Sequence, residues 1–178
     1  MRVYVEYDEH YWYPDDGGQV WIAGFQVVDR ESGRYLARES PELAALGLRV
    51  AGVAGAGAHH AEALATDAVA PGSALVLRRH PDNPHDPNAI QVHPPDGGDQ
   101  VGWVPRELAA ELAPELDALR PWAAVVLREH RRSPREPRDG LTMLLAPDSS
   151  IELSEPRAAR SPRSDAARTS PGRPGQPR

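Results

Sequence analysis

In the first 47 residues, short hydrophobic runs typical of strands alternate with clusters of turn-forming residues. The predicted strands are Val3–Val5, Val20–Val28 and Tyr35–Ala37, and the predicted turns are Pro14–Gly18 and Asp29–Gly33. Together they predict a three-stranded β-meander over residues 1–47. Because three strands hold together only marginally by themselves, we expect this meander to pack on the domain that follows.

From residue 48 onward the pattern predicts further strands and two helices. The strands are Leu48–Val53, Ala74–Arg79, Ala89–His93, Gln100–Val104, Trp122–Arg128 and Leu141–Ala146. One short helix is expected over His59–Ala68, and a second begins at Pro105, since proline suits a first helical turn. The apolar face of the second helix consists of Leu108, Leu112, Leu116 and Leu119. We expect Pro114 to kink or divide that helix. The fold class is mainly β (α+β).

Composition removes several classes of chemistry. All 20 basic residues of this 178-residue chain are Arg, and it has no Cys. Without Lys there is no Walker A lysine and no Schiff base, and without Cys there is no disulfide, thiolate zinc site or thiol nucleophile. The glycines Gly52, Gly55 and Gly57 have the wrong spacing for a dinucleotide-binding loop. The first residues lack a signal-peptide pattern and no apolar run is long enough to span a bilayer, so we expect a soluble, cytoplasmic protein without membrane contact.

Charge and aromatic residues are unevenly distributed. The net charge is −6, yet residues 154–178 hold six Arg and five Pro and no aromatic residue, so we expect a disordered tail. Its arginines either tether the protein to nucleic acid or have no function. Eight of the ten aromatic residues lie in the first 50 positions. Among them, Tyr11, Trp12 and Tyr13 either stack on bases or join the meander to the domain.

The most distinctive string runs from His80 to Ile90 and reads HPDNPHDPNAI. Three prolines fix the backbone there, and Asp and Asn side chains bond to nearby backbone groups, so the loop should be stiff. With the arginines that precede it, the sequence Val101-Gly102-Trp103-Val104 and the leucine-rich helix that follows, this string resembles the HIRAN domain family over residues 48–153.

The resemblance implies a small OB-like β-barrel with one or two helices, preceded here by the meander extension. In fork-remodelling DNA translocases such a domain binds the 3′-hydroxyl end of single-stranded DNA, and stand-alone bacterial proteins resemble the domain without a motor. We therefore expect a non-catalytic module that binds single-stranded DNA or DNA 3′ ends, without a cofactor. A motor or nuclease would be supplied in trans.

The resemblance places the contact to the 3′-hydroxyl on Asp86. An ionised carboxylate only accepts hydrogen bonds and repels a terminal phosphate, which suits this role. The alternative is that Asp86 locks the turn through the amides of Asn88 or Ala89. His85 stands where the family has a stacking aromatic residue. The candidate nucleic-acid-binding residues are Asp86, His85, Asn83, Asn88, Trp103, Arg106, Arg78, Arg79, His59 and His60.

Some of these positions have open alternatives. Trp103 either lines the binding groove or is buried beneath the rim, and Arg106 either lies near phosphates or is simply exposed. The family's second stacking aromatic residue and its neighbouring arginine are missing after Gly52, unless His59 and His60 take their place. The Arg-rich loop after the Trp122–Arg128 strand is either a phosphate contact or solvated.

Two other functional classes remain. A barrel that has lost DNA binding would serve as a protein-interaction module through its acidic surface and tryptophans. A metal nuclease would need clustered carboxylates, for which Asp82, Asp86 and Asp96 are the candidates. The histidines His80, His85 and His93 lack a recognised metal-binding spacing, so no metal site is expected.

Overall fold

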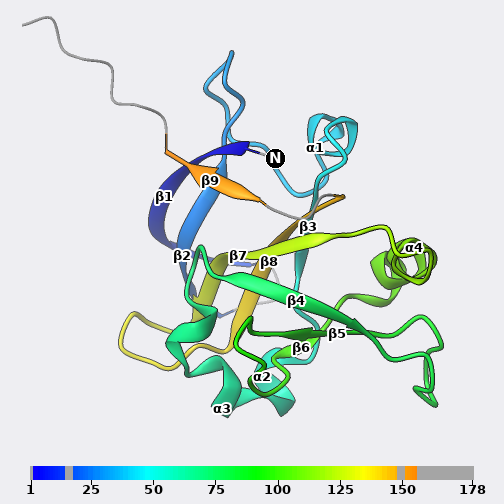
Figure 1. Cartoon of the computed structure of the whole chain (residues 1–178). Coiled ribbons are helices and arrows are strands. Elements are labelled where there is room, and N and C mark those ends of the chain that lie inside the picture. The colour runs from blue at the N-terminus through cyan, green and yellow to red at the C-terminus, as the bar shows by residue number, and fades with distance from the viewer. Residues whose placement is uncertain (1, 15–17, 148–150, 156–178) are drawn as a thin grey trace, which may run out of the picture.

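The computed structural model describes residues 2–14, 18–147 and 151–155. The strands are β1 (Arg2–Trp12), β2 (Val20–Val27), β3 (Arg49–Gly52), β4 (Ala74–Arg79), β5 (Ile90–His93), β6 (Gly102–Trp103), β7 (Ala123–Arg131), β8 (Gly140–Ala146) and β9 (Glu152–Ser154). The helices are α1 (Pro41–Ala45), α2 (Ala56–His59), α3 (Ala61–Leu64), the 3₁₀ helix η1 (Asp67–Val69) and α4 (Arg106–Asp117). Strands dominate, and the few helices lie at the edges of the sheet (Figure 1).

Strand β7 is the centre of the sheet. Its first half pairs with β4, its second half with β2, and β8 lies along its other edge. The strand order is β6-β5-β4-β7-β2-β1-β9, with β3 beside β8. A register shift between Val126 and Arg128 bends β7, as a β-bulge does, and divides its pairing between two neighbours. Gly24 of β2 is required at this crossing, because a Cβ there would lie 2.4 Å from the Leu127 carbonyl oxygen.

The strands form an OB-like arrangement whose sheet is not closed by its named strands. One isolated bridge nevertheless joins the two edges, between Ala54, just beyond β3, and Trp103 of β6. The Ala54 amide donates to the Trp103 carbonyl oxygen at 2.8 Å, and the Trp103 amide donates to the Ala54 carbonyl oxygen at 2.9 Å. The mainly β, OB-like fold expected from the sequence is therefore confirmed.

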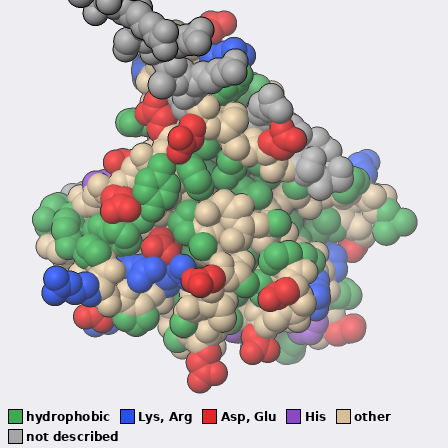
Figure 2. Space-filling view, turned by 60° about the vertical axis from the view of Figure 1, so that its left-hand side comes forward, with side chains coloured by type: hydrophobic (Ala, Val, Ile, Leu, Met, Phe, Trp, Pro, Cys, Tyr) green, Lys and Arg blue, Asp and Glu red, His purple; other side chains and the backbone are tan. Residues whose placement is uncertain are grey.

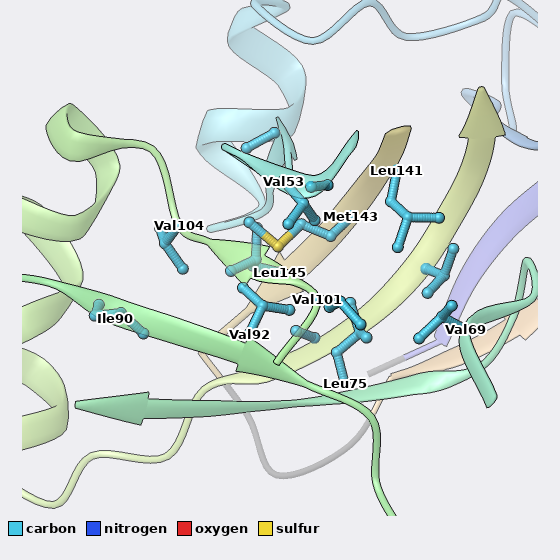
Figure 3. Packing of buried hydrophobic residues seen from close by; sticks show 14 of the residues in the cluster. Val53, Val69, Leu75, Ile90, Val92, Val101, Val104, Leu141, Met143 and Leu145 are labelled. Atoms are coloured by element: carbon cyan, nitrogen blue, oxygen red, sulfur yellow. The ribbon is translucent and has the colours of Figure 1, made fainter. Parts of the chain in front are cut away.

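Two hydrophobic clusters lie on opposite sides of β7 and β8. Because successive side chains of a strand point to opposite faces, Met143 and Leu145 join one cluster, whereas Leu144 joins the other. The first cluster fills the inside of the OB-like arrangement (Figure 3). The second is covered by the β1–β2 hairpin and α1, through residues such as Val5 and Leu43. The N-terminal hairpin thus packs on the following domain and extends its sheet.

Several local predictions need correction. The third meander strand at Tyr35–Ala37 is reduced to one bridge between Val28 and Tyr35. The helix expected over His59–Ala68 is divided into α2, α3 and η1. Pro114 lies inside α4 without dividing it. Leu119 lies beyond the end of α4, with a φ of 58° and 90% of its surface exposed, so it does not belong to the apolar face.

Strand β9 returns the end of the described chain to its beginning, since it pairs in parallel with β1 from Arg2 to Tyr4. The turn predicted at Pro14–Gly18 lies largely outside the described residues, and so does the tail from residue 156 onward. None of the described helices is long and apolar enough to cross a membrane.

Candidate nucleic-acid interface

The loop between β4 and β5 is held by its own side chains. Asn83 Oδ1 accepts a hydrogen bond from the His85 amide at 2.9 Å, and Asp86 Oδ1 accepts one from the Asn88 amide at 2.9 Å. Both are Asx turns, which polar side chains form where the backbone leaves a strand. The amide of Ala89 also donates to the Asp86 carbonyl oxygen, at 3.1 Å. The turn-locking role considered for Asp86 is therefore present in the structure.

Arg79 fastens this loop to the body of the domain. Its guanidinium donates to the carbonyl oxygens of Ala89 at 2.9 Å and Pro87 at 3.0 Å. It also forms two hydrogen bonds to the Asp117 carboxylate at the end of α4, at 2.9 and 3.1 Å. These hydrogen bonds hold the pKa of the Asp117 carboxyl below its usual value. Arg79, a candidate nucleic-acid-binding residue from the sequence, therefore holds the loop in place within the protein. Its neighbour Arg78 is exposed on β4.

A pocket of about 340 Å³ opens in front of the loop. It is lined by Ala54, Gly55, Asn83, His85, Asp86, Ala89, Trp103, Val104 and Arg106. Its floor is formed by Ala54 and Trp103, which the isolated bridge joins, and its wall is formed by the stiff loop. Five of the predicted site residues therefore meet in one pocket, although they come from distant parts of the sequence.

The Asp86 carboxylate has two different environments. Oδ1 is used inside the loop by the Asn88 amide. Oδ2 lies 3.7 Å from the Arg106 Nε, which is an ion-pair distance rather than a hydrogen bond. In the part of the chain that the structure describes, no donor forms a hydrogen bond with Oδ2. The carboxylate is thus fixed in position while one oxygen can accept a hydroxyl, and its side chain is only 18% exposed.

Arg106, at the start of α4, lies at the mouth of the pocket. Its side chain is 70% exposed, and its Nη2 donates to the His85 carbonyl oxygen at 3.2 Å. It partly neutralises Asp86 on one side and presents the rest of its guanidinium to solvent. A guanidinium in this position suits a phosphate that lies next to a hydroxyl bound by Asp86.

Trp103 offers an aromatic surface inside the pocket. It is partly buried, and its ring lies 5.8 Å from that of His80 at an interplanar angle of 33°. His80, which is not among the predicted nucleic-acid-binding residues, therefore backs Trp103. In the sequence, the one indication of a role for His80 is its place at the start of the HPDNPHDPNAI string. Of the two alternatives for Trp103, the structure shows a residue that lines the pocket.

His59 and His60 do not line this pocket. They line a neighbouring hollow of about 510 Å³, together with Asp99 and Gln100. Burial, followed by the nearby His59, lowers the pKa of His60. His59 is a neighbour of the pocket residue Gly55, since a Cβ at Gly55 would lie 3.8 Å from its ring and 3.8 Å from that of Trp103.

The arginines after β7 are largely used within the protein. Arg138 and Arg131 both pair with the buried Glu129, and Arg128 donates to Gln26 at 2.6 Å. Arg132 and Arg135 remain exposed. Among the described residues, no group of three His, Asp or Glu side chains is placed to hold a metal ion.

A stiff loop, a half-open pocket and an OB-like sheet together define a small binding module. A family model for the HIRAN domain matches residues 48–137, half of the sequence, and the chain belongs to the HIRAN family. HIRAN domains are DNA-binding modules for the 3′ ends of single strands, and the domain itself is not catalytic. The solved HIRAN domain of human HLTF is 29% identical, with a TM-score of 0.41, over 56% of this chain and 75% of that one. No curated protein matches the chain.

Proposed function

We propose that this protein binds the 3′-hydroxyl end of single-stranded DNA in the pocket between Asp86, Trp103 and Arg106. The proposal rests on the Asp86 carboxylate, of which only one oxygen is hydrogen-bonded within the loop. Asp86 lines the pocket, the Asn88 amide holds its Oδ1, and Oδ2 has no hydrogen-bond donor among the described residues. A terminal hydroxyl donates to Oδ2, whereas a terminal phosphate is repelled by it.

The residues that line the pocket indicate the other contacts to the DNA end. The last base stacks on Trp103, which His80 supports, and the last phosphodiester meets the exposed guanidinium of Arg106. Asn83 and Asn88 act indirectly by shaping the loop. The pocket holds about 340 Å³ and few cations surround it, so only the terminal nucleotides are bound and affinity is modest.

The test is fluorescence anisotropy with a 5′-labelled oligonucleotide that ends in either a 3′-hydroxyl or a 3′-phosphate. We expect the hydroxyl end to bind at least about tenfold more tightly, which corresponds to roughly 1.4 kcal/mol. Asp86→Asn keeps an oxygen for the Asn88 amide but removes the charge, so the preference should largely vanish. Asp82→Asn, an exposed position in the same loop that does not line the pocket, is the matched control.

Equal affinity for the two ends, or a preference that survives in Asp86→Asn, would overturn the proposal. Absence of binding to either end at low salt would favour a protein-interaction module instead. The exposed aromatic and acidic residues of β1 are the observation that supports this second candidate, since Trp12 is 54% exposed and Tyr7 is 49% exposed.

A further inference from the structure

Strand β1 carries a group of aromatic side chains that are exposed to solvent. Tyr7, Tyr11 and Trp12 are 49%, 41% and 54% exposed, and Tyr13, just beyond the strand, is 66% exposed. Tyr35 joins them, because its hydroxyl donates to Glu6 Oε2 at 3.1 Å. Val5 and Val27 are the buried residues by which the hairpin joins the second cluster, and the Tyr7 ring packs edge-on against Phe25, with ring centres 5.5 Å apart. Exposed aromatic residues in a group indicate a contact surface.

The same strand forms an open edge of the sheet. On one side, β2 pairs with β1 from Val5 to Trp12, whereas on the other side β9 reaches only from Arg2 to Tyr4. Beyond Tyr4, that outer side of β1 has no strand partner among the described residues. Natural proteins usually cover or charge such an edge.

The charge of this edge is negative. Glu6, Asp8 and Glu9 lie within the stretch from Val5 to Trp12, which contains no arginine. Figure 2 brings this side of the molecule forward and shows acidic side chains among hydrophobic ones. Arginine is the side chain that suits both groups, because its guanidinium pairs with carboxylates and stacks on aromatic rings. One contact of this kind is present in the structure, where the guanidinium of Arg30, in the turn after β2, lies 4.6 Å from the centre of the Tyr4 ring.

The described part of the chain ends close to this edge. Because β9 runs parallel to β1 with Ser154 opposite Tyr4, the last described residue, Glu155, follows directly where the open stretch of β1 begins. The segment 156–178 contains six arginines and one aspartate. Its arginine side chains are complementary in charge to the carboxylates of β1.

We propose that the C-terminal segment 156–178 docks on the open edge of β1, where its arginines pair with Glu6, Asp8 and Glu9 and stack on the exposed aromatic rings. The tether raises the effective concentration of the segment, so weak contacts suffice. Nucleic acid suits this edge less well, since three carboxylates repel phosphates. Strands β5, β4, β7 and β2 also separate β1 from the pocket strand β6. The proposal does not depend on DNA-end binding.

The absence of cysteine makes a direct test simple. In the full ¹⁵N-labelled chain, Ser170→Cys carries a nitroxide spin label, and amide peaks are compared before and after reduction of the label. We expect broadening of β1 amides from Glu6 to Trp12, and its loss at high salt, which screens charge pairs. A mixture of spin-labelled unenriched chain with ¹⁵N chain lacking the label should show no broadening, because the contact is intramolecular.

Two variants of equal net charge sharpen the test. Glu6→Gln, Asp8→Asn and Glu9→Gln together should abolish the broadening. Glu62→Gln, Asp82→Asn and Glu107→Gln together, at exposed positions elsewhere, should preserve it. Three results would overturn the proposal: no broadening of β1 in the full chain, broadening that persists without the three β1 carboxylates, or broadening in the mixture, which would make a second copy the occupant. If the β1 amides broaden only after an oligonucleotide is added, the edge would be assigned to nucleic acid.

Discussion

Gly102 lies so close to Val53 that a Cβ on the glycine would be 2.5 Å from the Val53 Cγ1 and 2.6 Å from the Ala54 carbonyl oxygen. The φ of Gly102 is 149°, which side chains other than glycine rarely adopt. This contact allows the bridge between Ala54 and Trp103, and the bridge in turn forms the floor of the pocket. A glycine far from the loop in sequence therefore shapes the proposed DNA site.

Gly102→Ala should lower the free energy of unfolding by about 3 kcal/mol, because it combines a strained φ with a clash against the backbone. Urea denaturation measures the loss. Gly97→Ala is the control, since Gly97 also has a positive φ, of 80°, but a Cβ there would meet no other atom within 4 Å. We expect it to cost about 1 kcal/mol. Equal losses in the two variants would mean that the close approach does not matter.

Arg79→Lys should destabilise the protein by about 2 kcal/mol and weaken binding of the DNA 3′ end, although Arg79 lies behind the loop. A lysine ammonium does not reproduce the bonds to Pro87, Ala89 and both oxygens of Asp117. Urea denaturation and anisotropy provide the two readouts. Arg78→Lys, at the exposed neighbouring position, should change stability by less than about 0.5 kcal/mol. If the two variants behave alike, Arg79 does not hold the loop.

Acidification below the usual histidine pKa should destabilise the fold through His130. Burial first, and then Arg128 and Arg38, lower the pKa of His130, with Asp139 acting in the opposite direction. The unfolded chain therefore binds a proton at a higher pH than the folded chain. The stabilisation is complete above about pH 6.5 and is lost as the pH falls toward the folded pKa.

Thermal unfolding between pH 7.5 and 5.5 tests this effect. His130→Gln should have a lower Tm at pH 7.5, because the imidazole contact to Thr142 Oγ1 at 2.9 Å is altered, but a smaller decrease in Tm on acidification. A pH dependence that is unchanged in His130→Gln would assign the effect to other groups, among them His60, whose pKa is also lowered.

Arg138→Met should cost about 3 kcal/mol of stability. It leaves Glu129, which is 6% exposed, with Arg131 as its remaining ion-pair partner. It also removes two hydrogen bonds from the Arg138 guanidinium to the carbonyl oxygens of Leu64, the last residue of α3, and of Thr66. Arg132→Met, at an exposed position in the same loop, should be nearly neutral. Similar urea midpoints for the two variants would contradict a structural role for Arg138.

The local sequence pattern by itself determined most strands, the stiff loop and the family of this protein. The alternation and turn residues predict most strands to within a few residues, because strand formation and turn chemistry depend on neighbouring side chains. The string from His80 to Ile90 identifies both a stiff loop and the HIRAN family, and the absence of Lys and Cys excludes whole classes of catalysis. The role of Asp86 in its own turn also follows from residues only two positions apart.

Only the tertiary structure shows those features that depend on contacts between distant parts of the chain. Sequence spacing does not show that Arg79 pairs with Asp117 or that Arg138 pairs with Glu129, because these ion pairs depend on how distant elements pack. It also does not show that β9 returns to β1. Pro114 is tolerated in α4 because packing against the core outweighs the local cost of the proline, and helix propensity is only a weak guide in such cases. The pocket, its floor and the open acidic edge exist only once the sheet is assembled.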